Sequence, residues 1–249
     1  MTYCLGIMLP CGLVLASDSR SSASVDQIMV VKKTALFQRP GERVIAILSA
    51  GNLATTQAVI TMLRQSAGGL QGEGGDGHGD GQDILAARTM FDVAQIVGDV
   101  LRIVVGRNKT YVQPYGDPDA TFLVGGQIAG ETHRLFQIYS AGNFIEAAGR
   151  TQFFQLGETK YGKPILDRAL ARTSDLDEAA KLSLLSFDAT IRSNLSVAPP
   201  IDMLIYEADS LSASKLITFD TENAYWKTLR DGYAAGLAQV VDSLPAPTF

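Results

Sequence analysis

The sequence predicts an α+β protein, and one arrangement that satisfies it is a four-layer αββα sandwich of two stacked antiparallel sheets flanked by helices. The predicted elements come in blocks of strands, two helices, strands, two helices, strands and a final helix. This order differs from the βαβα alternation of a parallel sheet. The chain has 249 residues, of which 46% are hydrophobic, so it can bury a large core. No linker divides it, and we expect a single domain over residues 1–249.

The first strands are predicted from apolar runs on either side of a Pro-Cys-Gly turn signal. Residues 3–10 and 13–17 are expected to pair as a hairpin. With a two-residue turn Thr2 faces Ser19, and a three-residue turn shifts its partner to Arg20. In either register the start of the chain lies beside the "SDSR" segment. Further strands are predicted over residues 28–31, 35–38 and 43–51.

Two helices are predicted to follow these strands. Asn52 is a candidate N-cap for a helix from Leu53 to about Gln65, and Asp83 for a longer helix that stops at Gly106. Residues from about 66 to 82 between them are rich in Gly and Asp. This composition cannot bury enough apolar surface to order itself, and it holds one imperfect copy of a calcium-binding repeat with no repeat period. We therefore expect a flexible surface loop.

The rest of the chain predicts a second block of strands, two helices, a third block of strands and a closing helix. Ser174 and Asp177 resemble a capping box at the start of the fourth helix. A C-terminal helical extension is expected over residues from about 222 to 249. The strands are predicted over residues 120–140 as a hairpin around Gly130, then 144–148, 152–157, 200–208 and 215–219, and the helices over 161–172, 174–194 and 222–241.

Composition argues against several functional classes. A net charge of −5 without any basic run offers no surface for nucleic acid or for an anionic membrane. The sequence has no signal-peptide features and no apolar run of roughly 20 residues, which favours a cytoplasmic location. Two histidines and two cysteines, without HExxH or CxxC, argue against zinc and against a histidine-dependent triad. No phosphate-binding glycine motif supports a nucleotide cofactor.

The second residue, Thr2, is a candidate nucleophile. A hydroxyl needs a base, and the α-amino group of the chain is suitable because its ordinary pKa of roughly 7.7–8.0 leaves a neutral fraction near pH 7. Threonine with its own N-terminal amine is a known pair of nucleophile and base. The chemistry requires that Met1 be removed. Threonine is also a common second residue, so the interpretation depends on other features.

Those features are found in the segments "LASDSR", "VVKKTALF" and "LSAGN". Together with the early threonine they resemble the N-terminal third of proteasome β-subunits and of the bacterial peptidase HslV, which are N-terminal-nucleophile hydrolases. The resemblance implies catalytic roles for Thr2, Asp18 and Lys33, and an oxyanion-hole N–H at Gly51. One residue fewer separates Asp18 from Lys33 than in that family. The competing interpretations are a surface ion pair for the two charges and a plain strand-to-helix turn for the glycine.

The lysine assignment also has a geometric side. If Lys33 points inward in an extended segment, Lys32 points outward. An inward Lys33 would pair with Asp18, lower the pKa of the Thr2 amine and stabilise the developing alkoxide.

Later segments depart from the proteasome pattern. Glu158 aligns with a supporting serine of the family, and in "SNLS" Ser196 is kept while Ser193 stands where the family has Asp. Together with "SNLSVAPPIDMLIYE" and the C-terminal extension containing Trp226, these departures make the chain resemble Anbu, the ancestral bacterial proteasome-like branch. They leave open a catalytically silent, self-assembling subunit, or an amidase of the same fold that acts on a small metabolite.

The resemblance implies an αββα fold, a peptide or protein substrate and catalysis with no metal or organic cofactor. It also implies a homo-oligomer with inward-facing sites, built as a ring or as an open helical assembly; no motif identifies an ATPase partner. By family position, four small or uncharged residues form the specificity pocket and favour a neutral substrate side chain. They are Ser21, Val31, Ser49 and Leu53. The leading hypothesis is a threonine peptidase that cleaves peptide or amide bonds through an ester at Thr2.

Overall fold

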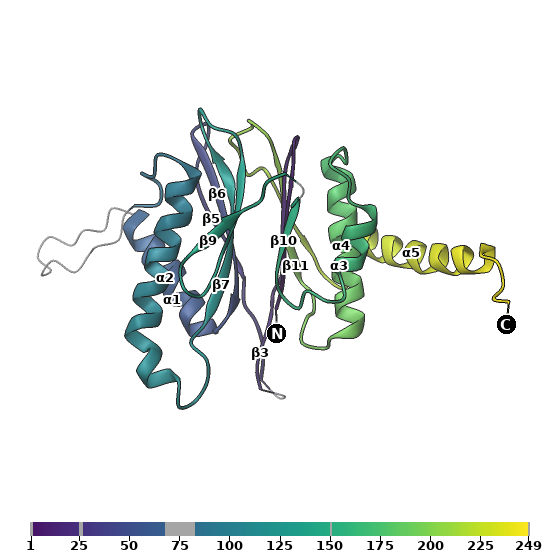
Figure 1. Cartoon of the computed structure of the whole chain (residues 1–249), viewed down its shortest axis with the longest axis horizontal. Helices are drawn as coiled ribbons and strands as arrows, with labels where there is room; N and C mark the ends of the chain where they lie inside the picture. The colour runs from purple at the N-terminus through teal and green to yellow at the C-terminus, as the bar shows by residue number, and fades with distance from the viewer. Residues whose placement is uncertain (1, 25–26, 68–82, 150, 249) are drawn as a thin grey trace, which may run out of the picture.

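The computed structural model describes residues 2–24, 27–67, 83–149 and 151–248 and confirms the predicted four-layer αββα arrangement (Figure 1). The five helices are α1 (Leu53–Ala67), α2 (Met90–Val112), α3 (Lys163–Ala169), α4 (Leu176–Ser193) and α5 (Ala224–Ser243). The strands are β1 (Tyr3–Leu9), β2 (Gly12–Asp18), β3 (Arg20–Ser24), β4 (Gln27–Val30), β5 (Thr34–Arg39), β6 (Arg43–Gly51), β7 (Ala120–Ile128), β8 (Arg134–Ile138), β9 (Phe144–Glu146), β10 (Phe153–Gly157), β11 (Ile201–Glu207) and β12 (Lys215–Phe219).

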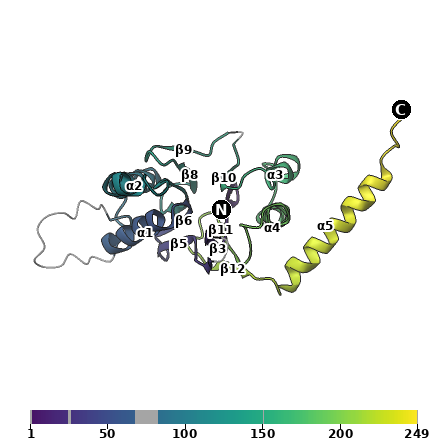
Figure 2. The ribbon, with the colours of Figure 1, turned by 90° about the horizontal axis from the view of Figure 1, so that it is seen from below.

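Two five-stranded antiparallel sheets stack face to face. One has the order β10-β1-β2-β11-β12 and the other β5-β6-β7-β8-β9, while β3 and β4 form a separate two-stranded ribbon. Helices α1 and α2 cover the second sheet, and α3 and α4 cover the first (Figures 1 and 2). Apolar clusters fill all three interfaces between the layers, and every residue of β2 is buried because it lies at the centre of its sheet.

The first hairpin takes the tighter of the two registers considered from the sequence. Cys4 faces Ser17 and Leu9 faces Gly12, which leaves a two-residue turn. This pairing brings the start of β1 beside the end of β2, so the N-terminal residues lie next to Asp18.

Two helix starts differ from the sequence-based expectations. Helix α2 begins after Thr89, not at Asp83, because Thr89 and Asp92 form a reciprocal capping box. It also runs past Gly106, where no neighbouring group crowds the backbone, and ends at Val112.

At α4 the predicted box of Ser174 and Asp177 is wrong. Asp175 is the N-cap and accepts from the Glu178 N–H at 2.7 Å. The Ser174 hydroxyl instead accepts from the Ala171 N–H in the preceding turn, so it is not free to cap the helix.

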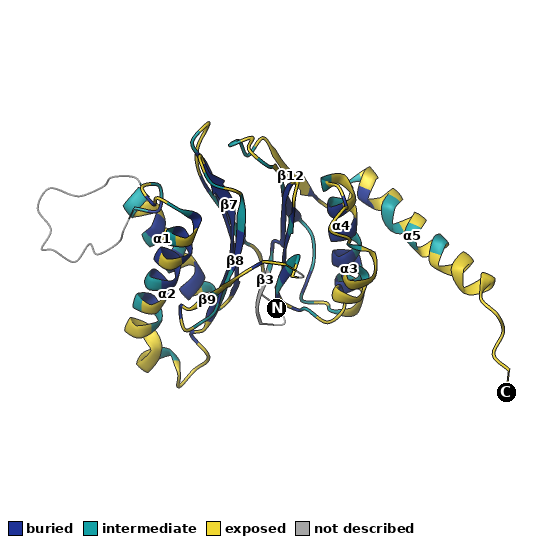
Figure 3. Cartoon of the chain, turned by 45° about the horizontal axis from the view of Figure 1, so that its top comes forward, coloured by how far each residue is buried: buried dark blue, intermediate teal, exposed yellow. Residues whose placement is uncertain are grey.

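Helix α5 projects away from the sandwich, as Figures 2 and 3 show. Its N-terminal Trp226 is its single fully buried residue, and most of the remaining side chains are exposed. The expected flexible Gly/Asp-rich loop lies almost wholly outside the described residues. Within the described ranges, no helix is both long and apolar enough to cross a bilayer.

Candidate active site

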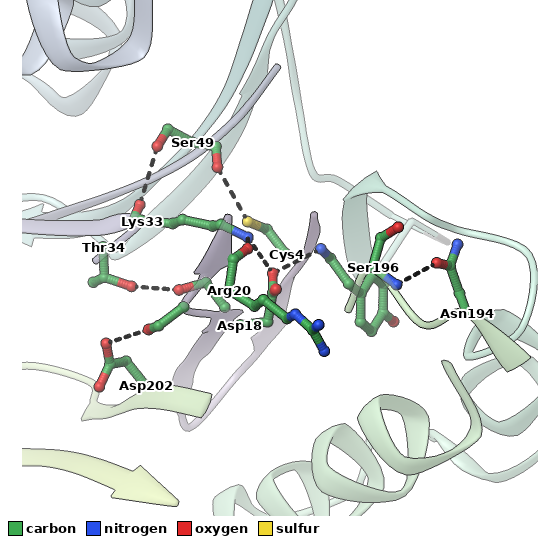
Figure 4. A network of polar contacts seen from close by, with 12 residues as sticks. Cys4, Asp18, Arg20, Lys33, Thr34, Ser49, Asn194, Ser196 and Asp202 are labelled. Carbon is green, nitrogen blue, oxygen red and sulfur yellow. Dashed lines mark hydrogen bonds and ion pairs between the residues drawn. The ribbon is translucent and has the colours of Figure 1, made fainter. Parts of the chain in front are cut away.

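A buried ion pair lies where β2 ends beside the start of β1. The Asp18 Oδ1 atom accepts from the Lys33 ammonium at 2.7 Å and from the Tyr3 N–H at 2.9 Å (Figure 4). The side chain of Asp18 is 0% exposed and that of Lys33 is 7% exposed. Lys32, the residue before Lys33, is exposed. The ion pair is therefore interior, and it is fixed by the backbone of the residue that follows Thr2.

Burial and charge act in opposite directions on Asp18. Loss of solvent raises the pKa of the carboxyl above its ordinary value, while the Lys33 ammonium and the Tyr3 N–H oppose that rise. A carboxylate in this position needs the lysine as its counterion, because an unpaired charge in the interior is strongly unfavourable.

Lys33 is held by further hydrogen bonds of its ammonium and of its main chain. Its ammonium donates a second hydrogen bond to the Arg20 carbonyl at 2.5 Å. Its own carbonyl accepts from Ser49 twice, from the backbone N–H at 3.0 Å and from the hydroxyl at 3.3 Å. The buried Cys4 thiol, 3.5 Å from the Ser49 carbonyl, packs behind this bridge (Figure 4). The lysine is thus tied to β6, the strand that leads to Gly51.

Thr2 is positioned from the opposite side by β10. Its carbonyl accepts from the Glu158 N–H at 2.8 Å. Gly157 makes this approach possible, because it has φ +77° and a Cβ there would lie 1.9 Å from the Thr2 carbonyl oxygen. The backbone of Thr2 is therefore fixed by a close contact that other residue types at position 157 would block.

A cavity of about 470 Å³ opens beside this cluster. Thr2, Lys33 and Gly51 all line it, and so do three of the residues assigned to the specificity pocket, Val31, Ser49 and Leu53. The fourth, Ser21, lies in β3, and its side chain is outside the described residues.

Gly51 combines two features that the sequence left as alternatives. It has φ +114°, and a Cβ there would lie 2.5 Å from the Asp119 carbonyl oxygen. Asn52 accepts from the Thr55 N–H at 3.2 Å and caps α1. The glycine thus makes a strand-to-helix turn and at the same time lines the cavity that contains Thr2.

The segment after α4 reaches the site through Glu158. The nearly buried Glu158 carboxylate accepts from the Asn194 side-chain Nδ2 at 3.0 Å, and the Asn194 side-chain Oδ1 accepts from the Ser196 N–H at 2.9 Å. Ser196 is partly buried in this turn, whereas Ser193 is exposed at the end of α4. The structure therefore joins Ser196 to Glu158 through Asn194, and no hydrogen bond of Ser193 to this network is found among the described residues.

Several contributors were missed from the sequence because they act through the backbone. The Tyr3 N–H and the Arg20 carbonyl hold the charged pair, and neither depends on a side chain that a motif could reveal.

Arg64 also lines the cavity, from a helical turn well beyond the motifs. The 3.6-residue period that links it to Leu53 and Gln57 was the available signal.

The layer order, the first hairpin and the position of the Asp18–Lys33 pair define a proteasome-like subunit. A solved structure described as Anbu (ancestral beta-subunit) from Yersinia bercovieri is 40% identical, with a TM-score of 0.91 over 99% of both chains. Anbu from Hyphomicrobium sp. strain MC1 is 42% identical, with a TM-score of 0.87 over 99% of this chain and 100% of that one. The chain belongs to the Anbu family.

A third solved structure, described as the helical assembly of the Anbu complex from Pseudomonas aeruginosa, is 41% identical, with a TM-score of 0.91 over 99% of this chain and 98% of that one. No protein-family model matches the chain, and no curated protein matches it either.

Proposed function

We propose that this chain is a threonine-type N-terminal-nucleophile hydrolase that cleaves peptide or amide bonds after removal of Met1. One observation carries the proposal: Lys33, ion-paired to buried Asp18, lines the same cavity as Thr2 and Gly51. A nucleophile, a fixed positive charge and a turn glycine at one cavity wall are the components that acyl transfer needs.

The proposed reaction proceeds through an ester. The Thr2 Oγ attacks the substrate carbonyl carbon while the freed α-amine takes the hydroxyl proton, and the Gly51 N–H stabilises the oxyanion. The C–N bond then breaks, and the proton passes to the leaving amine. The α-amine of Thr2 then deprotonates a water molecule, which attacks the ester, releases the acid and restores the Thr2 hydroxyl. Lys33 contributes its fixed charge and is not consumed.

We also propose that the working form is a homo-oligomer acting on peptides or proteins. The helical assembly of the Pseudomonas aeruginosa relative supports this. Helix α5 supports it too, since several of its apolar side chains are solvent-exposed in the isolated chain. They are Tyr225, Leu237, Val240 and Val241. No feature of the described residues identifies an ATPase partner.

Intact-mass spectrometry with a peptide vinyl sulfone tests the chemistry. In this reaction the Thr2 Oγ bonds to the β-carbon of the probe and the hydroxyl proton ends on the adjacent carbon, so the adduct adds the whole probe mass. We expect the purified protein to lack Met1 and to gain one adduct, which peptide mapping locates at Thr2. Thr2→Ala and Lys33→Ala should show no adduct, and Lys32→Ala should label at a rate close to that of the unmodified protein when the probe residues next to the reactive carbon are uncharged.

The variants also define what would contradict the proposal. Retention of Met1 in the native protein, or equal labelling of Thr2→Ala, would exclude Thr2 as the nucleophile. If Lys32→Ala were silent while Lys33→Ala reacted normally, the lysine assignment would be wrong by one residue.

A catalytically silent assembly subunit is the second candidate. The observation that favours it is Glu158, whose carboxylate is bound to Asn194 where the resembling family has a serine. A protein that lacks Met1, assembles normally and gives no adduct with any of several vinyl sulfones would support this candidate over the first.

A further inference from the structure

The cavity beside Thr2 extends as a groove along one face of α1. At 1.5 Å per residue, Leu53 and Arg64 lie about 16 Å apart along the helix axis. The α1 residues that line the groove recur at helical spacing and are Leu53, Thr56, Gln57, Ile60, Thr61 and Arg64. The groove therefore starts at the reacting threonine and ends at an arginine.

The charged residues that line this groove are all cationic. Lys32, Lys33 and Arg64 line it, and no carboxylate does among the described residues. Lys33 is neutralised by Asp18 at 2.7 Å. Lys32 and Arg64 form no ion pair within the described part of the chain, and both are exposed. Two cations thus face the groove without a carboxylate partner there.

The opposite side of Gly51 carries the opposite charge. A second cavity, of about 360 Å³, shares Ala50 and Gly51 with the first and is lined by Asp117 and Asp119. A negative substrate group is therefore favoured on the α1 side of the glycine and disfavoured on the other.

We propose that the α1 groove selects an acidic side chain, Asp or Glu, on one of the two substrate residues that precede the scissile bond. This inference rests on the proposed threonine hydrolase and names the substrate class of that site. It differs from the preference for a neutral side chain that four small or uncharged pocket positions favoured. The difference arises because Lys32 and Arg64 also line the cavity, Lys32 from the segment before β5 and Arg64 from α1.

Peptide vinyl sulfones with Glu, Gln or Lys at the two residues nearest the reactive carbon test this directly. Gln is the neutral match of Glu in shape, so their ratio reports charge alone. We expect Thr2 to react about tenfold faster with the Glu probe than with the Gln probe, and slowest with Lys. The ratio should shrink as salt rises, since both cations are solvent-exposed.

Arg64→Glu should abolish the preference, because Lys32 and the new carboxylate then offset each other, so that the Glu and Lys probes react at similar rates. Arg107→Glu is the matched control, because Arg107 is an exposed helical arginine without an ion pair among the described residues that lies on α2 and does not line the cavity. It should keep the order of the native protein. Circular dichroism of both variants checks that each is folded.

The outcomes separate this inference from the proposed function. Equal rates for the three probes, or a preference unchanged by Arg64→Glu, would overturn the acidic preference while leaving the threonine chemistry intact. If no probe modified Thr2, the hydrolase proposal would fail. Binding of the matching unreactive peptide amides, followed by fluorescence polarisation, would then decide: tighter binding of the Glu peptide, lost in Arg64→Glu, supports the acidic groove, and equal binding refutes it.

Discussion

Two lysine–aspartate pairs in this molecule have similar lengths and different surroundings. Lys33 and Asp18 are 2.7 Å apart with side-chain exposures of 7% and 0%. Lys163 and Asp167 are 2.5 Å apart on α3, with exposures of 52% and 47%. Distance alone would rank them as equals. Solvent access distinguishes the two pairs, because water screens the Lys163–Asp167 pair and is excluded from the Lys33–Asp18 pair.

The two pairs also differ in what positions them. Lys163 and Asp167 are one helical turn apart, so α3 alone brings them together. Asp18 and Lys33 meet because β2 ends beside the segment that enters β5, and the Tyr3 N–H and the Arg20 carbonyl complete their hydrogen bonds. The buried pair therefore depends on the tertiary fold, and the exposed pair depends on local structure.

The largest expected effect comes from breaking the buried pair on one side. Lys33→Met should lower the free energy of unfolding by about 3–5 kcal/mol near neutral pH, because it leaves the Asp18 carboxylate without its counterion. Urea unfolding followed by circular dichroism measures the loss. Lys163→Met, the matched control on α3, should change it by less than about 0.5 kcal/mol. Similar losses in both variants would contradict the comparison.

Tyr3, whose N–H binds Asp18, extends the comparison to a buried neutral side chain. Burial raises the pKa of its phenol to about 12. Because the folded chain then keeps this proton while the unfolded chain loses it, stability is present below about pH 10 and is lost as pH rises toward 12. At about 1.4 kcal/mol per pKa unit the total is on the order of 3 kcal/mol.

Urea unfolding at pH 9 and pH 11 of native protein and of Tyr3→Phe measures this contribution. The phenylalanine variant should lose less stability across the interval than the native chain does. Parallel losses in the two proteins would show that Tyr3 titrates normally. Ser186 and Gln155, which hydrogen-bond the phenol, lose a partner in the variant, so only the pH dependence is diagnostic.

Removing both charges of the buried pair should cost less than removing one. Asp18→Asn combined with Lys33→Met should retain a deficit of about 1–2 kcal/mol, because no uncompensated ion remains while the Tyr3 N–H still has an acceptor. The double-mutant cycle, built from the same urea curves, measures the coupling. A double variant as unstable as Lys33→Met alone would show that the loss came from packing rather than from charge.

The parts predicted correctly from the sequence share a physical feature: they depend on neighbours in the chain. The hairpin and its two candidate registers followed from the turn signal, and the structure takes the register with the two-residue turn. The αββα class followed from the order of blocks. Element ends were less predictable where two polar residues competed to cap, as Asp83 and Thr89 did at α2. Such competition is decided by which backbone N–H groups the fold leaves free.

The candidate site shows the same contrast between residues that short segments identify and contacts that depend on the tertiary fold. Thr2, Asp18, Lys33 and Gly51 could be proposed from short segments, and the structure brings them to one cavity wall and the ion pair behind it. The close approach of Thr2 to the end of β10, which Gly157 permits, could not be foreseen, because it depends on β10 pairing with β1. The cationic end of the groove depends in the same way on the packing of α1.

The smallest effect tests the exposed pair itself. Asp167→Asn should lower the free energy of unfolding by about 0.3–0.5 kcal/mol at low salt and by less at 1 M salt, because the pair is solvent-exposed and screened. The substitution leaves Lys163 in place 5.6 Å from the Phe153 ring, so the measurement reports the ion pair without that contact. A loss above about 1.5 kcal/mol, insensitive to salt, would mean that burial is not what distinguishes the two pairs.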